Sequence, residues 1–161
     1  MDLFDLTGKV ALVTGSTKGL GETSAKALAK AGADIAVCGR NPADLKRVST
    51  EIKDMGRNSA GFELDVLSKE KVKKGIEQVL NHFGRIDILV NNAGTNYRVP
   101  VLEYPEDKWD LIINTNLKGY FLVAQAVVPQ MIERGYGKVI NMSSIFGKVG
   151  LATQLAYASS K

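Results

Sequence analysis

The 161-residue sequence contains one cysteine, Cys38, and one histidine, His82. A lone thiol cannot form an internal disulfide, and one Cys and one His do not make a zinc ligand set, so we expect no metal site. No segment approaches the roughly 18 unbroken apolar residues of a membrane helix, and the start MDLFDLTGK lacks the basic-then-apolar order of a secretory signal. We therefore expect a cytoplasmic protein with no membrane partner.

The chain also lacks any cluster of basic residues. Its net charge is +4 and its pI is about 9.1, but the 21 Lys and Arg residues are spread among 17 acids, with no basic run and no interleaved aromatics. This spread favours a solvated surface, and we expect no nucleic-acid partner. With 45% hydrophobic and 24% charged residues, residues 1–161 have the composition of one globular domain.

Apolar runs of strand length alternate with longer segments of helical period, which is typical of parallel βαβ units. The predicted strands are 9–14, 34–38, a run marked by Phe62, Leu64 and Val66, then 86–91 and 138–142. The fold class is therefore α/β. We expect a Rossmann-type doubly wound parallel sheet with the strand order 3-2-1-4-5.

The predicted helices lie between these strands, and several have recognisable ends. Asn41 and Ser68 suit the capping position, Pro42 suits the first helical position, and glycines follow the expected ends. Pro129 should kink or fray the longest helix. The predicted helices are 18–31, 42–55, 68–83, 105–134 and a last one from about Tyr157.

A glycine-rich turn joins the first strand to the first helix, with the pattern Gly15-x-x-x-Gly19-x-Gly21. Glycine allows a tight turn and a close approach of the backbone to a pyrophosphate, whose charge the helix N-terminus stabilises. The spacing differs from the commonest dinucleotide motif, and such a turn can also be purely structural. Its place at the first turn of a βαβ chain favours a nucleotide site.

The second strand ends with Gly39-Arg40 and has no acid there to bind an adenosine ribose. Arg40 can bind a 2′-phosphate with two hydrogen bonds, and Lys18 offers a second positive charge from the glycine turn. These two bases favour NADP over NAD. The alternative is that both are solvated surface residues.

Tyr157 and Lys161 are four residues apart, which places them on one face of a helix. A tyrosine phenol exchanges protons near neutrality only beside a positive charge, and Lys161 would supply that charge. Tyr104 and Lys108 have the same spacing, but they straddle a predicted helix start and have acids beside the lysine. Ser144, at the end of the fifth strand and thirteen residues before Tyr157, has no counterpart for that second pair.

In these motifs the chain resembles the short-chain dehydrogenase/reductases. The resemblance extends over the whole chain and includes the glycine turn, the run Asn91-Asn92-Ala93-Gly94, Asn116, Ser144 and the Tyr157/Lys161 pair. It implies direct hydride transfer between a nicotinamide and a carbonyl or alcohol carbon. The chain is well short of the family's usual domain, so we expect it to lack the last strands and the last helix, to leave the fifth strand as an exposed apolar edge, and to be inactive alone.

The resemblance also implies roles for individual residues. Tyr157 would act as general acid or base, Ser144 would hydrogen-bond the substrate oxygen, and Lys161 would make the phenol more acidic and hold the nicotinamide ribose. Asn116 would position a water that relays protons to Lys161. The residues expected to bind the cofactor are Gly15, Ser16, Lys18, Gly19, Leu20, Gly21, Arg40, Asp65, Val66, Asn92, Ala93, Gly94, Tyr157 and Lys161.

Some alternatives stay open. Asn114 competes with Asn116 and Ser143 with Ser144, and Asp65 could instead cap a turn. The chain looks similar to members of the gluconate 5-dehydrogenase type, which act on sugar acids and polyols, with the 3-oxoacyl-carrier-protein reductases as the second reading. A catalytically silent nucleotide sensor or scaffold is the alternative of another class, and a methyltransferase would have no use for the Ser, Tyr and Lys set. The resemblance implies a small-molecule substrate and a homotetramer built on the long helices.

Overall fold

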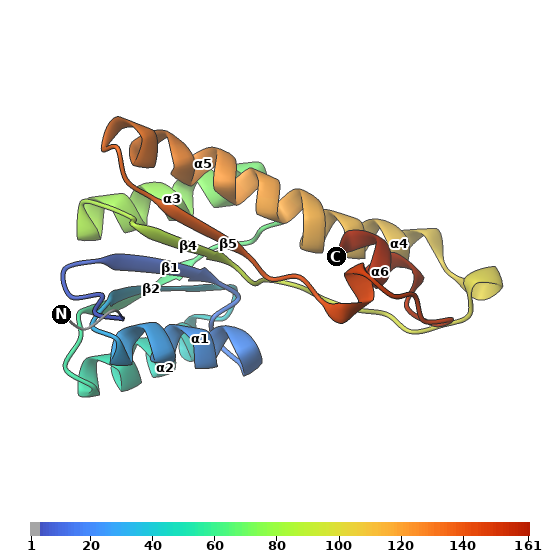
Figure 1. The fold of residues 1–161 in the computed structure, drawn as a ribbon, viewed down its shortest axis with the longest axis horizontal. Coiled ribbons are helices and arrows are strands. Elements are labelled where there is room, and N and C mark those ends of the chain that lie inside the picture. The colour runs from blue at the N-terminus through green and yellow to red at the C-terminus, as the bar shows by residue number, and fades with distance from the viewer. Residues whose placement is uncertain (1–3) are drawn as a thin grey trace.

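Five parallel strands form one sheet in the order β3-β2-β1-β4-β5, which confirms the predicted Rossmann-type order. The computed structural model describes residues 4–161 of the chain. Each strand pairs in parallel with its neighbours, and the first strand lies in the middle of the sheet (Figure 1). The strands are β1 (Val10–Thr14), β2 (Asp34–Gly39), β3 (Ser59–Glu63), β4 (Ile88–Asn91) and β5 (Lys138–Asn141).

Helices cover both faces of this sheet, with α1 and α2 on one face and α3 and α5 on the other (Figure 1). The α-helices are α1 (Gly19–Lys30), α2 (Pro42–Asp54), α3 (Lys69–Phe83), α4 (Glu106–Ile113), α5 (Gly119–Glu133) and α6 (Leu155–Ser160). Three short segments complete the set: the 3-10 turns η1 (Val101–Glu103) and η3 (Ile145–Gly147), and the π-helical segment η2 (Asn114–Lys118).

The predicted helix ends are confirmed by their hydrogen bonds. The Asn41 side chain accepts from the backbone N–H groups of Ala43 and Asp44 at 2.9 and 3.3 Å, and Ser68 accepts from the N–H of Lys71 at 3.2 Å. Gly84 ends α3 with φ of 73°, a left-handed conformation that suits glycine. These caps fix where α2 and α3 begin, and therefore how the chain leaves β2 and β3.

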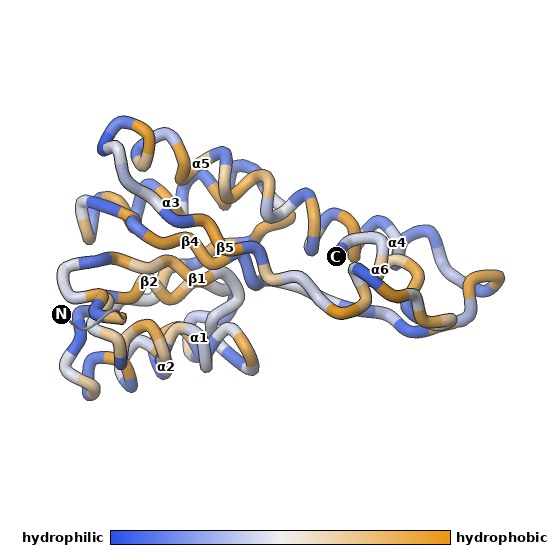
Figure 2. The backbone as a smooth tube through the Cα atoms, viewed as in Figure 1, coloured by the Kyte–Doolittle hydropathy of each residue, from blue (hydrophilic) through white to orange (hydrophobic). Residues whose placement is uncertain are grey.

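The side chains of β1 alternate between the two faces of the sheet and so belong to two separate cores. Leu12 packs with α3 and α5, whereas Ala11 and Val13 pack with α1 and α2. All three are fully buried. Figure 2 shows the same apolar character along β1, β2 and β4. Because both faces of these central strands are covered, their sequences are nearly continuous apolar runs.

The third strand lies earlier than predicted. It ends at Glu63, which pairs with Gly39, so only Phe62 of the three residues that marked it lies within the strand. Leu64 and Val66 follow the strand, where they are 3% and 7% exposed and pack in the core beside α3. Their alternation continues past the strand because the connection to α3 also buries every second side chain. The last helix likewise begins at Leu155, two residues before the predicted start.

The long helix is present, but its irregularity lies elsewhere than predicted. The helix runs through Pro129 to Glu133, and the change from α to π geometry occurs at Asn114–Lys118. The resulting 28-residue helix, Glu106–Glu133, is by length and composition apolar enough to cross a membrane, which the search for an unbroken apolar run does not reveal. One third of its most apolar window is buried inside the structure.

The fifth strand forms one edge of the sheet and leaves apolar side chains exposed, as predicted. All four of its residues are exposed, including Val139 at 43% and Ile140 at 46%. Its one strand partner in the described part of the chain is β4. A parallel edge strand of this kind offers unpaired backbone groups beside an apolar surface.

A buried carboxylate, Asp87, connects several elements at the amino ends of the strands, which we call the amino edge of the sheet. Asp87 is fully buried just before β4 and accepts hydrogen bonds from Arg85 at 2.6 and 2.7 Å, from Arg134 at 3.2 Å and from the N–H of Val10 at 2.9 Å. Burial raises the pKa of this carboxyl, but the hydrogen bonds and charge of the two arginines and the Val10 N–H outweigh it, and the net pKa is lowered. The carboxylate thus connects β1, β4 and the end of α5.

We predict that Asp87→Ala lowers the free energy of unfolding by about 2–3 kcal/mol, because the Val10 N–H and two arginines lose their shared acceptor. Urea unfolding at neutral pH measures this loss. The control is Glu77→Ala, which removes an exposed carboxylate 3.9 Å from Lys73 and should change stability by less than about 0.5 kcal/mol.

The same loss depends on pH in a defined direction. A carboxyl whose pKa is lowered in the folded state stabilises that state above the unfolded pKa of about 3.9, and this contribution disappears as the pH falls through the folded pKa. The difference between the wild type and Asp87→Ala should therefore be constant above about pH 5 and shrink below about pH 4. A difference that grows in acid would contradict the lowered pKa of Asp87.

Candidate active site

A cavity of about 610 Å³ opens at the carboxyl ends of β1, β2 and β4, where a parallel sheet places its ligands. We call it the glycine-turn cavity. Its volume lies within the range of small-molecule sites. Most residues predicted to bind the cofactor line it: Gly15, Lys18, Gly19, Leu20, Gly21, Arg40, Asp65, Val66, Asn92, Ala93 and Gly94.

The glycine turn has a geometry that larger residues could not keep. Gly15 and Gly19 have positive φ values of 63° and 55°. A Cβ on Gly21 would collide with the carbonyl oxygen of Gly15 and with the Asn92 side chain. The turn is therefore in direct contact with Asn92, at the start of the loop that follows β4. It has no room for a side chain at Gly21.

The helix that follows this turn, α1, begins without a side-chain cap. Its capping residue is Lys18, which makes no capping hydrogen bond, whereas α2 and α3 are capped by Asn41 and Ser68. The first N–H groups of α1 are thus left for another acceptor, and the helix dipole adds positive potential there. This arrangement fits the pyrophosphate of a dinucleotide.

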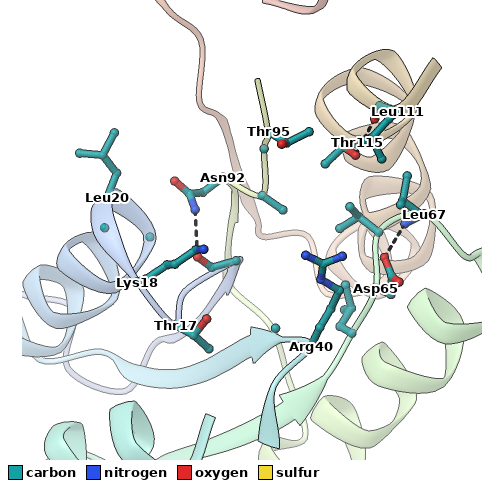
Figure 3. A pocket seen from close by; sticks show the side chains of 18 residues that line it. Thr17, Lys18, Leu20, Arg40, Asp65, Leu67, Asn92, Thr95, Leu111 and Thr115 are labelled. Carbon is teal, nitrogen blue, oxygen red and sulfur yellow. Dashed lines mark hydrogen bonds between the residues drawn. The ribbon is translucent and has the colours of Figure 1, made fainter. Parts of the chain in front are cut away.

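Thr14 and Asn92 hold the glycine turn against the loop after β4. The Thr14 hydroxyl accepts from the N–H groups of Asn92 and Ala93 at 2.9 and 3.0 Å. The Asn92 side chain donates to the carbonyls of Thr14 and Gly15 at 2.9 and 3.3 Å, and Figure 3 shows this amide turned toward the glycine turn. Two walls of the cavity are therefore connected by side-chain hydrogen bonds across a large sequence separation.

Arg40 enters the cavity from the end of β2, and Figure 3 shows its guanidinium between the glycine turn and the segment that carries Asp65. Lys18 lines the same cavity from the turn. The Asp65 carboxylate accepts from the N–H of Leu67 at 3.1 Å, so it both lines the cavity and shapes its own loop. The two bases predicted from the sequence therefore lie at one cavity.

Three of the residues predicted to bind the cofactor do not line the glycine-turn cavity: Ser16, Tyr157 and Lys161. Ser16 faces away from it. Its side chain is fully buried, accepts from the N–H of Cys38 at 2.9 Å and donates to the Cys38 carbonyl at 3.4 Å. The serine thereby joins the start of the turn to the end of β2. It does not line the glycine-turn cavity.

Sequence reasoning missed Arg47, which supports the turn from α2. Its guanidinium donates to the carbonyl of Thr17 at 2.8 Å and to the Glu22 carboxylate at 2.9 Å, and hydrogen bonds from Arg47 and Lys26 lower the pKa of Glu22 to about 2. The regular spacing of Glu22 with Lys26, and of Arg47 with Glu51, was the available signal. Other cavity-lining residues outside the prediction are Thr17, Gly39, Leu64, Leu67, Thr95, Leu111 and Thr115.

Asn116 lies in the π-helical segment and is 1% exposed. Its side-chain oxygen accepts from the N–H of Thr95 at 2.8 Å, and its amide nitrogen donates to the Thr95 carbonyl at 3.0 Å and to the Ser160 hydroxyl at 2.9 Å. One side chain thus joins the loop after β4, the long helix and α6. π-Helical segments are rare and occur frequently at functional sites.

The Lys161 ammonium lies 5.8 Å from the centre of the Tyr157 ring. Its hydrogen bonds go to two other groups, the Tyr120 hydroxyl at 3.0 Å and the Met142 carbonyl at 2.7 Å. Burial lowers the pKa of Lys161. The structure therefore brings the predicted tyrosine and lysine together and adds Tyr120, which the sequence did not single out.

Ser144 follows β5 and caps the short η3 turn by accepting from the N–H of Phe146 at 3.3 Å. The Phe146 ring lies edge-on to the Tyr157 ring, with 6.4 Å between the ring centres, so the segment that begins at Ser144 reaches Tyr157. Its competitor Ser143 donates instead to the Lys161 carbonyl at 3.1 Å. Ser144 and Tyr157 come from separate elements and share Phe146 as a neighbour.

A second cavity of about 340 Å³, the lysine cavity, is lined by Asn116, Tyr120, Met142, Ser143, Ser160 and Lys161 among others. The alternative pair, Tyr104 and Lys108, has other partners. The Tyr104 hydroxyl donates to the Tyr97 carbonyl at 3.1 Å, and Lys108 pairs with Asp107 at 2.8 Å. Of the two tyrosine and lysine pairs, the one on α6 lies beside a cavity that also holds Asn116.

The sequence profile of the short chain dehydrogenase family matches residues 9–161. The chain belongs to this family. It is 40% identical over 162 residues to a 2-dehydro-3-deoxy-D-gluconate 5-dehydrogenase of Pseudoalteromonas atlantica, covering 100% of this chain and 64% of the relative. It is 37% identical to a gluconate 5-dehydrogenase of Gluconobacter oxydans (99% and 62% covered) and 36% identical to the 3-oxoacyl-acyl-carrier-protein reductase FabG of Thermotoga maritima (97% and 63%).

Solved structures of this short chain dehydrogenase family have the same fold. A gluconate 5-dehydrogenase from Burkholderia cenocepacia in complex with NADP and tartrate has a TM-score of 0.94 at 39% identity, with 98% of this chain and 62% of the other covered. An NAD⁺-bound xylitol dehydrogenase has a TM-score of 0.93 at 36% identity, with 96% and 60% covered. The chain thus spans between 60% and 64% of the length of these family members.

For this family member we predict that Gly21→Ala weakens nucleotide binding by at least about tenfold, because the new Cβ would push the glycine turn away from Asn92. Calorimetric titration with NADP measures the change. Gly150→Ala is the matched control, since a Cβ there meets nothing within 4 Å. Equal affinities of the two variants would show that the closeness of this turn does not matter for binding.

Proposed function

We propose that the protein is an NADP(H)-dependent oxidoreductase that interconverts a carbonyl and a secondary alcohol, acting on a sugar acid or polyol. The observation that carries this proposal is the arrangement at the carboxyl edge of the sheet. The glycine turn and Arg40 line one cavity there, and Lys161 lies beside Tyr157 at a neighbouring one. The glycine-turn cavity suits a dinucleotide, and the pair of Tyr157 and Lys161 suits proton exchange with a substrate oxygen.

The glycine-turn cavity fits a nicotinamide dinucleotide. The uncapped start of α1 offers N–H groups to the pyrophosphate, and Asp65 and Val66 lie on the wall where the adenine is expected. Arg40 and Lys18 would bind the 2′-phosphate of NADP, although NAD stays the alternative. Among the similar structures, one contains NADP and the other NAD⁺. When bound, the nicotinamide supplies or takes up a hydride.

The chain's own residues would move the proton. Tyr157 donates a proton to the carbonyl oxygen in reduction and removes it in oxidation, and Ser144 donates a hydrogen bond to the same oxygen. The Lys161 ammonium stabilises the ionised phenol and holds the nicotinamide ribose. Asn116 positions a water that relays protons to Lys161; both residues line the lysine cavity.

The substrate class is supported by relatives whose names specify gluconate or 2-dehydro-3-deoxy-D-gluconate dehydrogenases. Similar reductases named for 3-oxoacyl carrier-protein substrates support the second candidate. We also propose a homotetramer that forms through the long helices, where exposed Leu117, Phe121 and Ile132 are 54%, 59% and 73% accessible. A cytoplasmic location is part of the same proposal.

We predict that Arg40→Ala raises the KM for NADPH about 10-fold to 100-fold and changes the KM for NADH by less than about threefold, because the lost guanidinium pairs only with the extra phosphate. Steady-state kinetics with both cofactors measures the split. Lys46→Ala, which removes an exposed charge from α2 outside the cavity, should leave both values unchanged. Equal effects of Arg40→Ala on the two cofactors would overturn the NADP assignment.

We predict that Tyr157→Phe lowers kcat at least about 1000-fold while the Kd for NADPH changes less than about threefold, because only the proton donor is removed. The assay follows NADPH oxidation by the full-length protein with a keto sugar acid and with an acetoacetyl thioester, and the preferred substrate separates the two candidates. Undiminished turnover in the variant would exclude Tyr157 as the proton donor. It would favour the alternative that the protein is a nucleotide sensor or scaffold.

A further inference from the structure

Tyr120 is a titratable residue that lines the lysine cavity and that the proposed chemistry does not use. It lies in the first turn of α5, four residues after Asn116, and its ring faces Lys161 with 5.0 Å between the ring centre and the ammonium. The Tyr120 hydroxyl, the Lys161 ammonium and the Met142 carbonyl form a closed triangle. Its sides are 3.0 Å from lysine to phenol, 2.7 Å from lysine to carbonyl and 3.3 Å from phenol to carbonyl.

With a charged lysine and a neutral phenol, the donors and acceptors of this triangle match. The Met142 carbonyl can only accept, so the Tyr120 hydroxyl donates its proton there and keeps a lone pair for the lysine. An ammonium can only donate, and it gives one proton to the phenol oxygen and one to the carbonyl. The third proton of the ammonium is not used within the triangle, and the Tyr157 ring centre lies 5.8 Å from the nitrogen. The charged lysine and the neutral Tyr120 therefore satisfy all three hydrogen bonds of the triangle.

Burial acts in opposite ways on the protonation states of this arrangement: it favours the neutral phenol of Tyr120 and disfavours the charged form of Lys161, so the ammonium depends on its hydrogen-bond acceptors. Burial raises the pKa of Tyr120 to about 12, so this phenol stays neutral, and burial lowers the pKa of Lys161. The titratable groups facing Lys161 are Tyr120 from α5 and Tyr157 from α6, while η2 and the end of β5 contribute the neutral Asn116, Asn141, Met142 and Ser143. Within residues 4–161 no carboxylate lies within ion-pair distance of the Lys161 ammonium, so neutral acceptors must stabilise its charge.

We propose that Tyr120 is a positioning residue for Lys161: its phenol oxygen, together with the Met142 carbonyl, fixes the lysine ammonium beside Tyr157. The inference rests on the proposed function, in which Lys161 acts on Tyr157 and on the cofactor ribose. Tyr120 itself exchanges no proton with the substrate. Its contribution is to keep the lysine charged and in one place while Tyr157 reacts.

The test compares Tyr120→Phe with the wild type in the full-length protein. Phenylalanine keeps the ring and removes one oxygen, so packing is retained, and Tyr120→Met gives a second variant without the oxygen. Tyr136→Phe is the matched control. The Tyr136 ring also lies beside lysine ammonium groups, those of Lys9 and Lys138 at 4.2 and 5.9 Å, but at the amino edge of the sheet.

The first measurement does not depend on activity. NMR titration of ¹³Cε-labelled lysines, with Lys161→Arg to assign the signal, gives the pKa of Lys161 in each variant. Because a hydrogen bond to the charged form raises the pKa of a lysine, loss of the phenol oxygen should lower the Lys161 pKa by about one unit. The Tyr136→Phe control should leave it unchanged. An identical Lys161 titration in wild type, Tyr120→Phe and Tyr120→Met would overturn the proposal.

The second measurement is the pH profile of kcat for alcohol oxidation. In Tyr120→Phe the alkaline limb should move to lower pH by the same interval, with the KM for NADP changed less than about twofold. A uniform loss of kcat at every pH would identify Tyr120 as a packing residue and overturn the proposal. If the wild type oxidises no alcohol, the proposed function fails, whereas the lysine titration still decides the role of Tyr120.

Discussion

The side-chain amide of Asn116 connects the three segments on which the candidate active site depends. It accepts a hydrogen bond from the N–H of Thr95 and donates to the Thr95 carbonyl and to the Ser160 hydroxyl. The side chain that makes these three bonds is almost fully buried. Thr95 belongs to the loop that closes the glycine-turn cavity, and Ser160 precedes Lys161 on α6. One amide inside a π-helical segment therefore connects the glycine-turn cavity to the helix end that carries Tyr157 and Lys161.

The glycine-turn cavity depends instead on close contact between backbone segments. At Gly21 there is no room for a Cβ, and a Cβ on Gly15 would lie 3.0 Å from the Cα of Ala93. Thr14, Asn92 and Arg47 hold the turn by hydrogen bonds from β1, the loop after β4 and α2. All of these contacts lie within the protein itself. The N-terminus of α1, which has no side-chain cap, is thus held in a fixed direction at the edge of the glycine-turn cavity.

Most of the fold follows from local features of the sequence, since caps, glycine ends and apolar runs are determined by neighbouring residues. The helix from Pro42 and the cap at Ser68 are of this kind. The strand order depends on pairing between distant segments, and it was expected from the Rossmann-type fold class. The third strand was misplaced because Leu64 and Val66 alternate in burial without being in a strand. Arg47 and Tyr120 were missed because their roles depend on partners 30 and 41 residues away, the Thr17 carbonyl and the Lys161 ammonium. Residue spacing in the sequence does not reveal such long-range contacts. Gly15, Asn92 and Tyr157 could be predicted because they belong to motifs of the family.

The central claim is that a nicotinamide held at the glycine turn and the proton donor on α6 act on the same carbonyl group. The most direct test is to supply the full-length protein with NADPH that carries deuterium on the transferring face of C4, in ordinary water, together with a keto sugar acid. The account predicts one deuterium on the carbinol carbon of the product and a solvent proton on its oxygen. Product with solvent-derived hydrogen on that carbon, or no transfer from either face of the cofactor, would contradict it.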